Sequence, residues 1–166
     1  MTTSTEPQQA DDGPPPDLCG LRLADFLLLR KLGQGGMGQV YLAEQISLKR
    51  NVALKILRPE LAASPKALER FKQEATAVAK VTHANIVQVY DVGEHDGSPY
   101  LALEYVAGGS LARRLAGAPL PPREAAALVE VLARAVHHAH ERGVVHRDLK
   151  PANVLLQRTE DRGQRT

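Results

Sequence analysis

The most informative stretch of the chain, at residues 146–153, reads His146-Arg147-Asp148-Leu149-Lys150-Pro151-Ala152-Asn153. It places a carboxylate, an ammonium and a carboxamide at fixed offsets. Asp148 can accept or orient a hydroxyl proton, Lys150 can meet a phosphate, and Asn153 can offer an oxygen to Mg2+. This combination fits the chemistry of phosphoryl transfer, which depends on positioning and charge neutralisation.

A glycine-rich stretch lies upstream, at residues 33–40, and reads Gly33-Gln34-Gly35-Gly36-Met37-Gly38-Gln39-Val40. Glycines let a backbone turn approach phosphates and direct its N–H groups at them. Two alternatives are a plain hairpin turn that needs positive φ and a dinucleotide-binding loop. The dinucleotide loop requires a helix directly after the glycines, whereas an extended run, residues 40–43, follows here. We therefore expect a hairpin, either over phosphates or as a plain turn.

Lys55 closes Val52-Ala53-Leu54-Lys55, the first part of the strand-like run at residues 52–57. A lysine at the end of such a strand is often only a solvent-exposed side chain without a functional role. Its place after the glycine stretch favours a functional role.

Glu74 lies on a helix that we expect to begin at Ser64, where a capping hydroxyl precedes a proline. The spacing puts Glu74 on the same side as the apolar Phe71, so the carboxylate needs a cationic partner. Lys55 is the natural candidate. An alternative is a surface ion pair within residues 69–74, and Glu69 is a rival for the role.

The order of the predicted elements indicates an α+β fold. The predicted strands cover residues 26–30, 40–43, 52–57, 86–90 and 100–104, and the predicted helices begin at residues 64, 111 and 122. Strands that follow one another without intervening helices argue against a parallel doubly wound sheet. Asp96-Gly97 predicts a turn between the last two strands, and Gly143 should end the last helix.

Composition excludes several classes of protein. The chain has 166 residues, of which 43% are hydrophobic and 24% charged, and its net charge of +2 is too slight to indicate nucleic-acid binding. No apolar run reaches the length of a membrane span. The single cysteine, Cys19, permits no internal disulfide, so we expect a reducing, cytoplasmic setting. His137 and His140 share a helical face, but no carboxylate or cysteine cluster completes a metal site there.

Taken together, these motifs resemble the protein kinase superfamily, and within it the bacterial eukaryotic-like serine/threonine kinases. The resemblance implies an N-lobe at residues 23–106, with a five-stranded antiparallel sheet and one helix, and a partial C-lobe at residues 107–166. The polar, proline-rich residues 1–22 predict a disordered tail. The resemblance also implies ATP and Mg2+, and a protein substrate that offers a serine or threonine hydroxyl.

The resemblance implies roles for the nucleotide-binding residues. The loop Gly33 to Val40 would lie over the ATP phosphates, with Met37 at its tip. Ala53 would help to cover the adenine. Leu103 resembles the gatekeeper, and residues 104–106, which include Glu104 and Val106, resemble the hinge that offers backbone groups to adenine.

The resemblance implies catalytic roles as well. Lys55 would hold the α- and β-phosphates and pair with Glu74. Asp148 would be the catalytic base, Lys150 the contact to the γ-phosphate, and Asn153 a ligand of Mg2+.

The sequence departs from the family pattern after the catalytic loop. No Asp-Phe-Gly follows Asn153, and Asp161-Arg162-Gly163 does not replace it. We therefore expect an incomplete, truncated domain, complete only in its parent gene or with a complementing kinase fragment. The alternatives are a pseudokinase-like module that binds ATP or a partner without catalysis, and a remnant that does not fold. We also expect the helix at residues 122–142 to lack partners for its apolar face, which is an aggregation risk.

Overall fold

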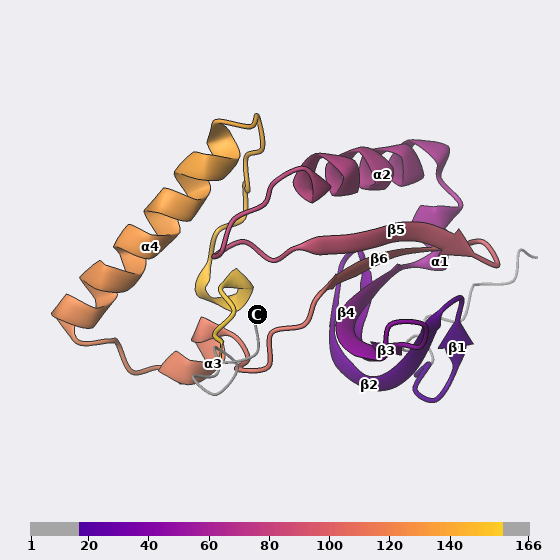
Figure 1. Cartoon of the computed structure of the whole chain (residues 1–166), viewed down its shortest axis with the longest axis horizontal. Coiled ribbons are helices and arrows are strands. Elements are labelled where there is room, and N and C mark those ends of the chain that lie inside the picture. Colours follow the sequence, from indigo (N-terminus) through magenta and orange to yellow (C-terminus); the bar gives the residue numbers. More distant parts are fainter. Residues whose placement is uncertain (1–16, 158–166) are drawn as a thin grey trace, which may run out of the picture.

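The computed structural model describes residues 17–157, except for the side chain of Glu74. It consists of a twisted antiparallel sheet with a helix lying along it, and a smaller helical part beside them (Figure 1). The sheet has six strands in the order β1-β2-β3-β4-β6-β5. Their bounds are β1 Arg22–Leu23, β2 Phe26–Gly35, β3 Gly38–Gln45, β4 Arg50–Leu57, β5 Val89–His95 and β6 Ser98–Glu104. No helix within residues 17–157 is long and apolar enough to cross a bilayer.

The expected five-stranded antiparallel sheet is confirmed, with the two-residue strand β1 as an addition that the sequence did not indicate. The predicted turn at Asp96-Gly97 joins β5 to β6, and both residues have positive φ, 47° and 72°. Positive φ at both central residues matches the twist of a tight antiparallel hairpin. Residues 17–22, part of the expected tail, are hydrogen-bonded to the sheet. Residues 1–16 lie outside the described residues.

One face of the sheet forms the core. Side chains alternate between faces along a strand, and alternate residues in the middle of β3, β4 and β6 are buried. The buried cluster comprises Leu23, Phe26, Leu28, Tyr41, Ala43, Val52, Leu54, Ile56, Tyr100 and Ala102. Phe26 and Tyr100 meet edge to face, with ring centroids 5.5 Å apart. The opposite face is only half-buried.

Two helices follow β4, the short α1 (Pro59–Ala62), which the sequence did not predict, and α2 (Pro65–Ala79). The expected start of α2 is confirmed, because the Ser64 hydroxyl accepts a hydrogen bond from the Ala67 N–H at 3.4 Å. Phe71 and Ala75 are buried on its inner side, and α2 contacts β5.

The helical part contains α3 (Leu111–Leu115), α4 (Pro122–His140) and the single 3-10 turn η1 (Pro151–Asn153). Gly143 follows α4 with φ +74°, as expected for a residue that ends a helix. In Figure 1, α4 stands at the outer edge of the molecule. Ala135 is its buried residue, while Val129 and Val131 are 61% and 42% exposed. Leu128, Leu132 and Ala139, on the same face as Ala135, are of intermediate exposure. The expected lack of cover is therefore observed for Val129 and Val131 but not for this apolar face.

Candidate nucleotide-binding and phosphoryl-transfer site

The glycine-rich stretch forms the hairpin between β2 and β3. Gly33 pairs with Val40, Gln34 with Gln39, and Gly35 with Gly38. At Gly38 a Cβ would lie 2.0 Å from the backbone oxygen of Ile56 on the neighbouring strand. Gly38 is therefore required by close backbone packing.

The other glycines of the hairpin are not required by packing or by backbone conformation. At Gly33, Gly35 and Gly36 a Cβ would meet nothing within 4 Å. None of these three residues is among the described glycines with positive φ, so the interpretation as a turn that needs positive φ is wrong. Open space above a backbone without side chains leaves room for a ligand close to the N–H groups.

Strand register brings several apolar residues and Lys55 together on the half-buried face of the sheet. Directly paired residues of an antiparallel sheet share a face. The pairs are Val40 with Lys55, Leu42 with Ala53, Lys55 with Leu101, and Ala53 with Leu103. All six side chains are of intermediate exposure. Four of them were predicted from the sequence. Leu42 and Leu101 were missed, although the alternation along β3 and β6 was a signal that could have found them.

Lys55 points toward the tip of the glycine hairpin. Its Nζ lies 3.8 Å from the sulfur of Met37, which a weak thioether acceptor allows. The hairpin tip is also held by the residue that follows β4, because the Arg58 N–H donates to the Met37 carbonyl at 3.1 Å. The lysine thus lies beneath the glycine hairpin.

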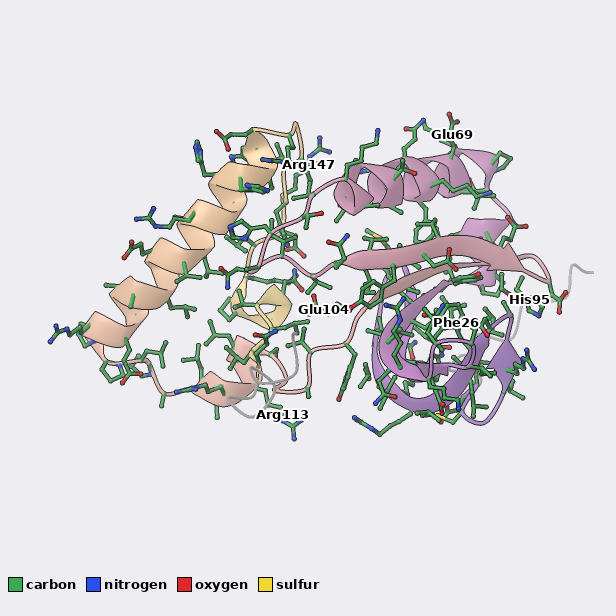
Figure 2. The ribbon with its side chains drawn as sticks, viewed as in Figure 1. Phe26, Glu69, His95, Glu104, Arg113 and Arg147 are labelled. Atoms are coloured by element: carbon green, nitrogen blue, oxygen red, sulfur yellow. The ribbon has the colours of Figure 1, made fainter. Side chains whose placement is uncertain are left out.

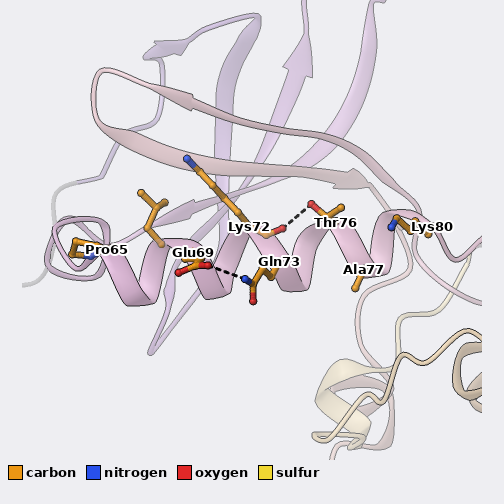
Figure 3. A pocket seen from close by; sticks show the side chains of 8 residues that line it. Pro65, Glu69, Lys72, Gln73, Thr76, Ala77 and Lys80 are labelled. Carbon is orange, nitrogen blue, oxygen red and sulfur yellow. Dashed lines mark hydrogen bonds between the residues drawn. The ribbon is translucent and has the colours of Figure 1, made fainter.

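The expected pairing of Glu74 with Lys55 rests on a side chain outside the described residues, and it stays a prediction. Glu69, the other candidate partner of Lys55, has different surroundings. Glu69 is exposed on the outer side of α2, where its carboxylate accepts a hydrogen bond from Gln73 at 3.0 Å (Figure 3). Lys72 pairs with Glu94 at 3.3 Å. The outer face of α2 lines a shallow hollow of about 580 Å³ that does not include Lys55.

The segment that joins the two parts of the molecule begins at Glu104, the last residue of β6 (Figure 2). Its backbone N–H donates to the Gln88 carbonyl at 2.9 Å, and its carboxylate accepts from the Gln88 N–H at 3.3 Å. These bonds hold the start of the connection against the residues that lead into β5. Tyr105 and Val106 follow with intermediate exposure.

The three functional groups of the stretch at residues 146–153 lie together. The Lys150 ammonium is 2.9 Å from an Asp148 carboxylate oxygen. The Asn153 amide nitrogen donates to the Asp148 carbonyl at 2.7 Å and to its carboxylate at 3.0 Å. Because Nδ2 makes both bonds, Oδ1 is the atom that Asn153 can offer to a metal. We refer to these three residues as the catalytic-loop cluster.

These contacts set the ionisation of Asp148. The hydrogen bond from Lys150, and next that from Asn153, hold the pKa of the Asp148 carboxyl below its usual range. Hydrogen bonds to the charged form of an acid favour that form. Asp148 is therefore an anion at neutral pH, as an acceptor for a hydroxyl proton must be.

The backbone around the cluster is anchored to the residues before α3. The Leu111 N–H donates to the Val154 carbonyl at 2.7 Å, and the Leu156 N–H donates to the Gly109 carbonyl at 2.8 Å. Gly108 lies so close to this segment that a Cβ would be 2.0 Å from the Leu156 oxygen. Arg147, at the end of the connection from α4 (Figure 2), has φ 61°. A non-glycine residue in this region is strained and is held there by its surroundings.

His138 of α4 has structural partners. His138 Nε2 lies 3.0 Å from the Thr82 carbonyl, and its ring centroid is 4.8 Å from that of His83. These contacts join α4 to the connection after α2. No group of three or more metal-ligating side chains occurs within residues 17–157.

The sequence and the fold match known protein kinases. The family described as Protein kinase domain matches residues 26–162. The serine/threonine-protein kinase PrkC of Bacillus subtilis is 44% identical over 141 residues, which are 84% of this chain and 22% of that protein. PknB of Mycobacterium leprae is 42% identical over 133 residues, 77% of this chain and 21% of that protein.

The crystal structure of the Mycobacterium tuberculosis PknI kinase domain superposes with a TM-score of 0.72 at 38% identity. The superposed region covers 83% of this chain and 57% of the PknI chain. The chain therefore belongs to the protein kinase domain family, and its relatives are bacterial serine/threonine kinases. It spans about a fifth of the length of these two curated relatives.

Proposed function

We propose that this chain forms the nucleotide-binding part and the catalytic loop of a serine/threonine protein kinase, which transfers the γ-phosphate of ATP to a hydroxyl of a protein. The catalytic-loop cluster is the observation that carries the proposal. It holds the ionised Asp148 carboxylate within hydrogen-bonding distance of both the Lys150 ammonium and the Asn153 amide. Family membership supports the assignment.

In the proposed reaction, the Asp148 carboxylate accepts the hydrogen bond of the incoming serine or threonine hydroxyl and then its proton. The hydroxyl oxygen forms a bond to the γ-phosphorus, and the bond from that phosphorus to the bridging oxygen of ADP breaks. Lys150 offsets the negative charge of the transferred group. Asn153 Oδ1 would hold Mg2+, which supplies further charge neutralisation at the phosphates.

The proposed nucleotide site lies on the half-buried face of the sheet. Gly33 to Gly38 would bring backbone N–H groups to the phosphates, and Lys55 would contact the α- and β-phosphates. Glu74 would orient Lys55. Ala53 and Leu103, neighbours across β4 and β6, supply apolar contact for the adenine ring.

Val40 and the segment that begins at the end of β6 would also contact the nucleotide. Val40 lies on the same face as Lys55. The backbone of Glu104 and Val106 would meet the polar edge of the adenine.

The experiment that tests the mechanism mixes the chain with a polypeptide that supplies the rest of the C-lobe and measures transfer from γ-labelled ATP to a serine- and threonine-containing protein. Asp148→Asn keeps the size of the side chain and removes the proton acceptor, so the rate should fall about 100-fold or more. Asp25→Asn is the control, because Asp25 accepts hydrogen bonds from Ser47 at the far end of the hairpin. Transfer that survives Asp148→Asn unchanged would rule out the mechanism.

We also propose that transfer requires a polypeptide that supplies the rest of the C-lobe. The chain covers 57% of the PknI kinase domain, and apolar residues of α4 are exposed. Mixing the chain with such a fragment should restore transfer. Binding of Mg-ATP by calorimetry, with no transfer in either sample, would favour the binding module instead. A cytoplasmic location is part of the proposal, because ATP is the substrate and Cys19 is a free thiol.

A further inference from the structure

The segment before the first strand is built into the base of the glycine hairpin. We call Asp17 to Leu21 the N-terminal strap. The Leu18 N–H donates to the Tyr41 hydroxyl at 3.1 Å, and this hydroxyl donates to Gln39 Oε1 at 3.1 Å. Tyr41 is completely buried and Gln39 is 7% exposed. Gln39 follows Gly38 directly, so this relay reaches from the strap to the first residues of β3.

The strap also bonds to the other strand of the hairpin. The Gly20 N–H donates to the Leu28 carbonyl at 2.7 Å, and the Leu28 N–H donates to the Leu21 carbonyl at 2.9 Å. Leu28 borders a register shift in β2, where the regular ladder between β2 and β3 is interrupted. The strap therefore adds backbone bonds on the other side of a residue that β3 pairs through Ala43.

The strap has a defined shape of its own. The Leu21 N–H donates to the Leu18 carbonyl at 3.1 Å, and Gly20 has φ +82°. The Asp17 carboxylate accepts from the Cys19 N–H at 3.1 Å. Leu18 packs against the core cluster. A closed turn with an apolar anchor is an ordered structure, not a loose end.

The hairpin needs such support because its tip has little packing. Gly33, Gly35 and Gly36 have no neighbours at their Cβ positions. Gly38 is the exception, because it lies against β4 at the start of β3, next to the turn. Apart from the bond from the Arg58 N–H to the Met37 carbonyl, the position of the glycines is thus set mainly by the strands that lead to them. Burial raises the pKa of the Tyr41 hydroxyl, so it keeps its proton and remains a donor at neutral pH.

We infer that Tyr41 is a positioning residue, through which the N-terminal strap fixes the glycine hairpin over the phosphates of the nucleotide. The inference rests on the proposed function for the identity of the ligand. The mechanical link between the strap and the hairpin does not depend on it.

The link is tested by hydrogen–deuterium exchange on the full chain without nucleotide. Tyr41→Phe keeps the ring and removes the hydroxyl. Backbone amides of residues 33–40 should exchange about five- to tenfold faster, because one buried hydrogen-bond relay is lost. Amides of β6 should keep their rates. Tyr100→Phe is the matched control, since Tyr100 is also buried in the sheet but its hydroxyl donates to Asp91 at 3.2 Å.

A second variant perturbs the strap from outside the core. Gly20→Ala forces a side chain into a left-handed conformation, yet the new Cβ meets nothing within 4 Å. It should also speed exchange in residues 33–40. Gly97→Ala is its control, because Gly97 has φ +72° with equally open space at the turn between β5 and β6.

The inference is overturned if the amide of Leu18 exchanges faster in both variants while residues 33–40 keep their wild-type rates. It is equally overturned if β6 accelerates by the same factor, because the effect is then global unfolding.

The affinities for Mg-ATP and for adenosine distinguish a loss of hairpin positioning from a general loss of the nucleotide site. Because the hairpin would contact phosphates, Tyr41→Phe should weaken Mg-ATP about fivefold or more and leave adenosine unchanged. Equal weakening of both ligands contradicts a positioning role. If the wild-type chain binds neither ligand, the proposed function fails, while the exchange rates still decide whether the strap holds the hairpin.

Discussion

At the scale of single residues, two glycines of one hairpin have different physical roles. Gly38 lies against the backbone of β4, whereas Gly36 faces open space. A family pattern treats them alike, but the structure separates a packing requirement from room for a ligand. The difference can be measured without knowing the ligand.

We expect Gly38→Ala to lower the free energy of unfolding by about 1–3 kcal/mol, because its Cβ would overlap a backbone oxygen that has no freedom to turn away. Gly36→Ala should change it by less than about 0.5 kcal/mol. Urea denaturation of the two variants is the measurement. Equal stabilities would mean that the close approach of Gly38 to Ile56 is not constrained.

The ionisation of Asp148 is a second property of single residues. Its pKa lies below the ordinary value of about 3.9 because Lys150 and Asn153 stabilise the anion. The stabilisation is therefore present above the ordinary pKa and is lost as the pH falls through the lowered one. Lys150→Gln should raise the pKa of Asp148. The pKa of Asp25, which Ser47 lowers, should not move. Carboxyl NMR titration of the wild-type chain and of Lys150→Gln measures the shifts, and an unmoved Asp148 contradicts the assignment.

At the scale of elements, α2 depends on a local signal at its start. Ser64 caps the helix and Pro65 occupies its first turn, so the residue pattern alone fixes where the helix begins. The helix matters because it carries Glu74, the proposed partner of Lys55. Loss of the cap should therefore lower the stability of the chain, and it should affect phosphoryl transfer only through the position of α2.

Ser64→Ala should destabilise the chain by about 1 kcal/mol, because the Ala67 N–H loses its acceptor. Thr76→Ala provides a control in the same helix. The Thr76 hydroxyl only bonds back to the Lys72 carbonyl, so its replacement by a better helix former should be neutral or slightly stabilising. Thermal unfolding followed by circular dichroism compares the two. A larger loss in Thr76→Ala would contradict the capping role.

At the scale of the whole molecule, the sheet and the helical part differ in how well they are covered. The sheet buries one full face, while α4 leaves Val129 and Val131 exposed. His138 and Thr82 provide one contact between the parts. Exposed apolar side chains on a helix favour association with other apolar surfaces.

We expect the isolated chain to aggregate with increasing concentration, and Val129→Glu with Val131→Glu to reduce this. Arg123→Ala with Arg134→Ala changes the net charge by the same amount on the same helix but removes no apolar surface, so it is the control. Light scattering across a concentration series is the measurement. Equal improvement in both double variants would assign the effect to charge rather than to the exposed valine side chains.

The sequence by itself determined the local features of this protein. The catalytic-loop cluster, the glycine hairpin, the cap of α2, and the turn at Asp96-Gly97 depend on residues close together in the chain. Their backbone conformations and hydrogen bonds follow from local chemistry. Most of the site could therefore be predicted as residue types and spacing.

Only the tertiary structure decided which side chains share a face and which segments hold the site. The register between β3, β4 and β6 placed Leu42 and Leu101 beside Lys55. The hydrogen bond from the Leu18 N–H to the Tyr41 hydroxyl attaches part of the expected tail to the sheet. In the inferred arrangement this part of the chain supports the hairpin. Such contacts join residues far apart in sequence, and they form only because the fold buries one face of the sheet. Periodicity within a single segment carries no information about them.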